Sequence, residues 1–394
     1  MMPLHFTACT AASGLGLGIE ATLQGLRANR SGLQPNRFGA LPFACHTGIV
    51  DEAVQLPAAL QHFNCRNNRL ALLGLQQDGF IAAVRECAAR RGASRVGVFL
   101  GTSTAGIHET ELAYRRLDAD AALPADFSYA DTHNPWALAA FVRELLQLTG
   151  PASVVCTACS SSAKVFGVAQ RMMAAGLIDA ALVGGVDSLC LTTLYGFHSL
   201  QLVSAQPCRP FDVARDGISI GEAAAFVLLE RLPDSLDADA VWLAGVGESS
   251  DAYHMSSPHP QGQGALTAMQ AALAAAGLEP ADVNYLNLHG TGTRANDKTE
   301  ATAVNTLFVQ PVPCSSTKGA TGHTLGAAGA LEAVICALAL RHGFTPGSPH
   351  TREPEPALAA QYQCLPRAAA LSCVLSNSFG FGGANCTLAL RRAN

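Results

Sequence analysis

The chain has 394 residues, of which 49% are hydrophobic and 14% are charged, and its formal net charge is -5. This length accommodates two domains or one large two-part core, and the 37 glycines indicate a globular interior of tightly packed small residues. The acidic balance gives no support to nucleic-acid binding, and no run of about 18 apolar residues predicts a membrane span. Thirteen irregularly spaced cysteines and an N-terminus without a secretion signal favour a reducing cytoplasm.

The first half of the chain alternates apolar strands with helices. Residues 4–10 are typical of a strand, and the glycine-rich residues 13–18 lead into an amphipathic helix over about 19–27. The glycine spacing resembles a dinucleotide-binding fingerprint, but no acidic residue follows a second strand at the required distance, so we expect a tight turn. Arg66 and Arg69 open a helix and project from one side of it. Further strands are expected over 95–101, 180–186 and 224–230, a helix over 135–148, and an excursion over 115–135.

The second half of the chain repeats this pattern. Residues 232–237 are a linker candidate, which predicts two halves spanning 1–236 and 237–394. Residues 154–176 and 312–343 both show a strand, a polar turn and a helix rich in Ala and Gly, which indicates a duplicated α/β unit. The other elements expected are strands over 240–246, 283–288, 371–375 and 386–390, and helices over 264–275, from 299, and over 326–341.

Residues 154–164 contain the candidate nucleophile. An apolar strand is followed by a short turn and a helix over 163–175, so Cys159 lies near a helix N-terminus. Unpaired N–H groups and the helix dipole favour an anion there, which predicts a stabilised thiolate. Cys156 gives a formal redox spacing with Cys159, but no second cysteine pair completes a metal site, so we expect Cys156 to be a buried strand residue.

Three other stretches offer partners for a nucleophilic thiol. His289 follows a strand in a loop of Gly and Thr, and His323 precedes a buried helix, with Lys318 five residues before it. The glycine-rich turn 380–383 exposes backbone N–H groups that suit an oxyanion. Acyl chemistry on a cysteine requires such donors together with groups that handle protons or charge on the incoming partner.

Together these stretches resemble β-ketoacyl-acyl-carrier-protein synthases of the elongating type, in the thiolase superfamily. The resemblance extends over nearly the whole chain and implies a thiolase-like α/β fold with duplicated halves in five αβαβα layers. The matching motifs are Thr157-Ala158-Cys159-Ser160-Ser161, His289-Gly290-Thr291-Gly292-Thr293 with Asn296-Asp297, Thr317-Lys318 with Gly322-His323 and Gly326-Ala327-Ala328-Gly329, and Asn377-Ser378-Phe379-Gly380-Phe381-Gly382-Gly383.

The resemblance implies a decarboxylative Claisen condensation. Cys159 would take the acyl chain from a carrier protein, and His289 and His323 would stabilise the enolate formed when malonyl-carrier loses carbon dioxide. Lys318 would order the site, paired with Glu332, and the backbone N–H groups of Cys159 and Phe381 would hold the oxyanion. No cofactor or metal is expected, because the phosphopantetheine arm belongs to the acyl carrier protein.

The resemblance also implies substrate contacts and partners. The arm should meet Thr291, Thr293 and Ser256, and the acidic carrier protein should meet Arg66 and Arg69. The acyl pocket should be lined by Thr104, Phe197 and residues near Asn134 of a dimer partner, and gated by Phe379 and Phe381. The enzyme is expected to be a homodimer, or a heterodimer with a chain-length-factor-like subunit.

Several positions depart from the usual family pattern. Thr104 stands where a bulkier aliphatic residue or Gly is usual, Arg294 replaces a usual Pro, and residues 196–207 are shorter and differently composed. These changes concern the substrate rather than the reaction, and they favour a specialised pathway such as aryl-polyene synthesis. Two alternatives are a coenzyme A-dependent thiolase, which lacks its second cysteine here because Cys386 lies beyond the turn, and a non-catalytic chain-length-factor-like subunit, which an intact Cys159 opposes.

Overall fold

The structure, a computed structural model, describes residues 2–51 and 54–393. Within that part of the chain, ten strands follow one path, β12-β11-β15-β16-β10-β1-β9-β7-β5-β6, with β2 beside β1. The strands are β1 (Leu4–Ser13), β2 (Gly16–Leu17), β5 (Val96–Gly101), β6 (Ala152–Val155), β7 (Ala180–Asp187), β9 (Ala223–Arg231), β10 (Val241–Ser250), β11 (Tyr285–Asn287), β12 (Cys314–Ser315), β15 (Cys373–Gly380) and β16 (Ala384–Arg392). Small accessory sheets hold β3 (Gln34–Pro35), β4 (His46–Gly48) and β8 (Ile220–Gly221), and β13 (Phe344–Thr345) and β14 (Arg367–Ala368).

The path consists of two five-stranded sheets with identical topology. The first runs β1-β9-β7-β5-β6 and the second β10-β16-β15-β11-β12, so β5, β6 and β7 correspond to β11, β12 and β15. In each sheet these three strands are parallel and the next strand is antiparallel. The two sheets join where β1 pairs with β10 at Leu4 and His5. The duplication predicted from the sequence is therefore confirmed, whereas the division at residue 236, in the connection between β9 and β10, stays a prediction.

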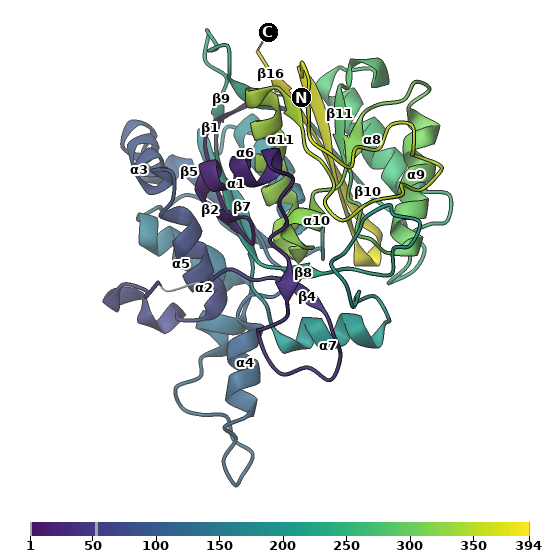
Figure 1. The fold of residues 1–394 in the computed structure, drawn as a ribbon. Coiled ribbons are helices and arrows are strands. Elements are labelled where there is room, and N and C mark those ends of the chain that lie inside the picture. The colour runs from purple at the N-terminus through teal and green to yellow at the C-terminus, as the bar shows by residue number, and fades with distance from the viewer. Residues whose placement is uncertain (1, 52–53, 394) are drawn as a thin grey trace.

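Helices form three layers around the two sheets (Figure 1). Helices α6 and α11 lie between the sheets, α2, α3 and α5 cover the outer face of the first sheet, and α8 and α9 cover the outer face of the second. The helices are α1 (Gly18–Arg27), α2 (Arg66–Leu75), α3 (Phe80–Arg91), α4 (Ile107–Tyr114), α5 (Trp136–Leu146), α6 (Ser161–Ala174), α7 (Leu191–Ser199), α8 (Gln263–Ala276), α9 (Arg294–Leu307), α10 (Lys318–Thr321) and α11 (Ala328–His342). This is the five-layered αβαβα arrangement that the sequence predicts.

Small residues let the two central helices approach closely. A Cβ atom on Gly329 of α11 would lie 2.5 Å from the backbone nitrogen of Ala163 in α6, so only glycine fits there. The segment Leu325–His342 is apolar enough to pass a membrane-span criterion, but 89% of it is buried inside the protein. Its hydropathy therefore follows from its place in the central layer, where both faces meet apolar side chains.

One helix begins earlier than the sequence predicts, and the excursion expected over 115–135 is confirmed. Helix α9 begins at Arg294, five residues before the expected start, because the loop that precedes it is tied back onto the first turn of the helix. The region 115–135 contains no long helix or strand of its own, and it projects from the body beyond α4 (Figure 1).

Candidate active site

Cys159 occupies a tight turn between β6 and α6. The preceding residue, Ala158, has φ +51°, a left-handed conformation that is strained for a residue with a side chain. Gly380 packs against this turn, and a Cβ atom there would lie 2.6 Å from the carbonyl oxygen of Thr157. The turn aims the Cys159 side chain toward the second half of the molecule, where it is only 7% exposed.

The prediction of a stabilised thiolate is wrong for the resting protein. Burial raises the pKa of the Cys159 thiol to about 11, and the Lys318 charge and the backbone N–H groups of Phe381 and Cys159 offset this only in part. Cys159 does lie next to the N-terminus of α6, but the desolvation of the sulfur has a larger effect on the thiol pKa than the helix dipole has. The thiol therefore carries its proton at neutral pH and must lose it during acylation.

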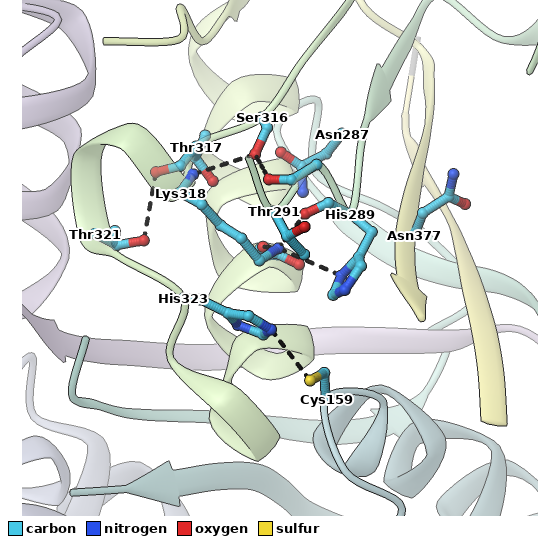
Figure 2. A network of polar contacts seen from close by, with 12 residues as sticks. Cys159, Asn287, His289, Thr291, Ser316, Thr317, Lys318, Thr321, His323 and Asn377 are labelled. Carbon is cyan, nitrogen blue, oxygen red and sulfur yellow. Dashed lines mark hydrogen bonds and ion pairs between the residues drawn. The ribbon is translucent and has the colours of Figure 1, made fainter. Parts of the chain in front are cut away.

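His323 is the immediate partner of this thiol. Its Nε2 lies 3.1 Å from Sγ of Cys159 (Figure 2). The backbone N–H of Leu325 donates a hydrogen bond to Nδ1 of His323 at 3.2 Å, so Nδ1 is the acceptor and Nε2 bears the hydrogen. Burial first, and then the Lys318 charge, hold the pKa of His323 well below its usual value. His323 is thus a neutral hydrogen-bond donor facing Cys159.

His289 is held in the same state by Lys318. The Lys318 ammonium lies 3.4 Å from Nδ1 of His289 and donates a hydrogen bond to the His289 carbonyl oxygen at 2.5 Å. It also pairs with Glu332 at 2.5 Å, and both side chains are almost completely buried. Burial, Lys318 and His323 lower the pKa of His289 well below its usual value. An ammonium next to Nδ1 leaves the hydrogen on Nε2, since an ammonium can only donate.

The two imidazole rings converge on one point. Their centroids lie 5.3 Å apart with an interplanar angle of 82°, and the His289 ring also contacts Phe379. Figure 2 shows both rings directed toward the region above Cys159. A carbonyl oxygen placed between them would receive two neutral N–H donors, and burial strengthens such donors because water is excluded.

Two carboxylates that the sequence reasoning did not assign support the His289 loop. Glu300 of α9 accepts hydrogen bonds from the backbone N–H groups of His289 and Gly290, each at 2.8 Å, and burial raises its pKa to about 7. Asp297, quoted only as part of a motif, accepts from the backbone N–H groups of Thr291 and Gly292. No sequence signal marks Glu300, because the sequence of α9 does not show that this carboxylate is buried.

A cavity opens above Cys159, His289 and His323. It brings together residues predicted to act in catalysis and in substrate binding, including both Phe residues of the turn 379–383. Phe197 contacts Phe381 with ring centroids 5.8 Å apart. The predicted residues that line the cavity are Cys159, Phe197, Ser256, His289, Thr291, Thr293, His323, Phe379 and Phe381.

Thr104 lies elsewhere in the single chain. It is buried, and its hydroxyl donates a hydrogen bond to Asp187 at 2.7 Å, so it does not line the cavity. Asp187 also accepts from Thr102 and from the backbone of Ser103, whose hydroxyl donates to the carbonyl oxygen of Ala158. In this chain Thr104 therefore belongs to the support of the Cys159 turn.

The two predicted carrier-binding arginines differ in their surroundings. The guanidinium of Arg66 forms an ion pair with Glu222 through two nitrogens, and the side chains are 15% and 0% exposed. Arg66 therefore anchors α2 to the core, which corrects its assignment as a surface contact. Arg69 donates a hydrogen bond to Asn64 at 2.8 Å and borders a surface pocket, so it remains a candidate for carrier binding.

Cys156 is exposed, whereas the sequence predicts a buried strand residue. It is exposed because it follows the edge strand β6.

Comparison with known families agrees with this geometry. Residues 46–235 match the β-ketoacyl synthase N-terminal domain, and residues 241–352 match the β-ketoacyl synthase C-terminal domain. The chain belongs to the β-ketoacyl synthase family. The boundary between the two matched regions falls near the predicted boundary at residue 236.

The chain is similar to curated proteins with two different names and to solved ketosynthase structures. Nodulation protein E of Rhizobium meliloti is 36% identical over 308 residues, which cover 76% of each chain. The 3-oxoacyl-[acyl-carrier-protein] synthase 2 of Staphylococcus aureus is 31% identical over 366 residues, covering 86% of this chain and 88% of that one. Among solved structures, the ketosynthase ApeO in complex with its chain length factor ApeC, from Xenorhabdus doucetiae, is 38% identical with a TM-score of 0.91, covering 100% of this chain and 98% of the other.

Proposed function

We propose that the synthase is the catalytic condensing subunit of a specialised pathway that extends a carrier-bound polyene or polyketide-like chain. The reaction is that of a 3-oxoacyl-[acyl-carrier-protein] synthase, an acyltransferase, as in the relatives of this chain. The observation that carries the proposal is the buried set of Cys159, His323 and His289 in the lining of one cavity, with the Lys318 ammonium beside His289. The structural similarity to a ketosynthase that works with a chain length factor supports the specialised pathway.

In the first half-reaction Cys159 receives the acyl chain. The sulfur attacks the carbonyl carbon of the incoming thioester. The backbone N–H groups of Cys159 and Phe381, which lie close to the sulfur, would stabilise the oxyanion that forms on the attacked carbon. The new C–S bond forms, the bond to the carrier's sulfur breaks, and the proton from Cys159 leaves with the carrier thiol. Overall, one thioester is exchanged for another.

In the second half-reaction the two histidines act on malonyl-carrier. The bond between the malonyl carbon and its carboxylate breaks, carbon dioxide leaves, and the electron pair moves onto the thioester oxygen as an enolate. Nε2–H of His289 and of His323 donates to that oxygen. The enolate carbon then attacks the acyl carbonyl on Cys159, a carbon–carbon bond forms and the carbon–sulfur bond to Cys159 breaks. The released Cys159 thiolate takes up a proton from solvent, which restores the resting thiol.

The tautomers of the histidines favour this reaction over metal binding. Donor atoms of Cys159, His289 and His323 lie within 4.8 Å of one another, a set that zinc could use. Metal binding at either Nε2 would require a hydrogen on Nδ1, where Leu325 and Lys318 already present hydrogens. We therefore expect no metal and no cofactor of the synthase's own, the phosphopantetheine arm being part of the carrier substrate.

We expect a second subunit beside β6. This strand ends the first sheet, and its four residues are all partly exposed, so its outer edge is open for pairing. A chain-length-factor-like subunit fits this edge, by analogy with the ApeO complex and with the ishigamide ketosynthase/chain length factor. Residues near Asn134 of the partner remain the predicted contribution to the acyl pocket.

All thirteen cysteines are free, which supports the proposed cytoplasmic location.

A reconstituted condensation assay tests the proposal. The purified synthase, with acyl-carrier and malonyl-carrier, should yield the 3-oxoacyl product and an acyl adduct on Cys159 by intact-protein mass spectrometry. Cys159→Ala should give neither, whereas the exposed neighbour Cys156→Ala should give both. Normal elongation by Cys159→Ala would disprove the mechanism, and cleavage of 3-oxoacyl-coenzyme A by the wild type would favour a thiolase. Comparing saturated, polyene and aryl starters would test the pathway.

A further inference from the structure

The rim of the active-site cavity carries a basic side chain that the reaction described above does not use. Arg294 is the first residue of α9, and it is exposed. Its neighbours Thr293, Ala295 and Asn296 line the cavity that leads to Cys159. Arg294 is therefore an exposed residue whose chain neighbours form part of the cavity wall.

Local electrostatics disfavour an arginine at this position. A helix N-terminus is the positive end of the helix dipole, so a cation there is destabilising, and proline is a common residue at the first helical position. Lys298 lies one turn further on, is also exposed, and adds an unfavourable pair of like charges at i and i+4.

Nothing in the described part of the chain compensates for this charge. The structure gives the Arg294 side chain no ion pair or hydrogen bond with residues 2–51 or 54–393. The acidic residue in the first turn, Asp297, is buried and accepts backbone N–H groups of Thr291, Gly292 and Phe211. Asp251, which lines the same cavity, accepts a hydrogen bond from the side chain of Asn385 at 2.8 Å. The described part of the chain therefore provides no carboxylate partner for the Arg294 side chain.

We propose that Arg294 binds the phosphate of the phosphopantetheine arm when the thioester lies at Cys159. The inference rests on the proposed function, because it takes the arm from the carrier-dependent reaction. An arm that places its thioester at the base of the cavity leaves its phosphate at the outer end, near the rim. A guanidinium presents paired N–H donors that match phosphate oxygens, and the dipole of α9 adds to the attraction. Lys298 contributes charge without a fixed contact.

Acyl donors that differ only in the phosphate test this assignment. The synthase would be given hexanoyl-carrier, hexanoyl-phosphopantetheine and hexanoyl-pantetheine, and kcat/KM for acylation of Cys159 would be measured by mass spectrometry. For Arg294→Ala, the ratio of kcat/KM with phosphopantetheine to that with pantetheine should fall about fivefold, as expected for an ion pair at an exposed rim. Arg294→Lys should recover most of the loss.

A matched control variant shows whether any change in the ratio is specific to Arg294. Arg85→Ala removes an exposed arginine from α3, remote from the cavity lining, and should leave the ratio unaltered. An unaltered ratio in Arg294→Ala would overturn the assignment. A loss of kcat/KM seen only with the intact carrier would also overturn it, since Arg294 would then contact the carrier protein rather than the phosphate of the arm. If the wild type is acylated by none of the three donors, the proposed function itself fails.

Discussion

The backbone N–H of Leu325 donates a hydrogen bond to Nδ1 of His323 and thereby determines which ring nitrogen faces Cys159. Leu325 adopts φ +52° in the segment that makes this contact, a conformation that is costly for a leucine. Ala158, next to Cys159, has a similar φ of +51°. The two reacting side chains are thus each positioned by a strained residue on the adjoining backbone.

The rate of condensation should not depend on pH in the way expected for a histidine with an ordinary pKa. Burial and Lys318 hold the pKa of His289 and His323 well below the usual value of about 6.5, so both remain neutral as the pH falls through that value. The single-turnover rate of pre-acylated synthase with malonyl-carrier should therefore show no midpoint near pH 6.5. A loss of rate centred there would contradict the neutral-donor assignment.

The buried pair of Lys318 and Glu332 should be more costly to break than to remove. Lys318→Met leaves a buried carboxylate without its partner and should lower the free energy of unfolding by about 3–5 kcal/mol. Replacing both residues, as Lys318→Met with Glu332→Met, should recover much of that loss in urea unfolding. Condensation should not recover, since His289 no longer has an ammonium at Nδ1. Equal destabilisation by the single and double variants would argue against this account.

Alkylation of Cys159 should report its raised pKa. With a pKa of about 11, the thiolate fraction rises about tenfold per pH unit below that value, and so should the rate of modification by iodoacetamide between about pH 7 and 9. The rate would be followed by mass spectrometry of the Cys159 peptide, which separates it from the exposed Cys156. A rate that levels off below pH 8 would show that the thiol is more acidic than its burial indicates.

Arg66 and Arg69 should have separable effects. Arg66→Ala leaves the buried Glu222 carboxylate without its ion pair and should cost about 3–5 kcal/mol of stability in urea unfolding. Arg69→Ala should change stability by less than about 1 kcal/mol and raise the KM for carrier-bound substrate without altering kcat. If Arg66→Ala is as stable as the wild type, the anchoring role is wrong.

The strands and the turn around Cys159 could be predicted from the sequence because their signals are local. Apolar runs bounded by glycine define β5, β7 and α6 to within a few residues. Contacts between distant segments left no such signal. Nothing near Arg66 indicates that Glu222 lies against it, and the sequence of α9 does not reveal that Glu300 is buried against the His289 loop. The burial of the Cys159 sulfur could not be predicted from the sequence either, which is why the prediction of a stabilised thiolate was wrong.

The repeated topology places the thiol and its imidazole partner at equivalent positions. Cys159 follows β6, and His323 follows β12, the corresponding strand of the second half. The active site thus lies at the interface between two copies of one structural unit, and neither copy contains both the thiol and the two imidazoles. Two identical units paired in this way would present the same loop twice. In this chain the two equivalent loops differ, because one carries Cys159 and the other carries His323.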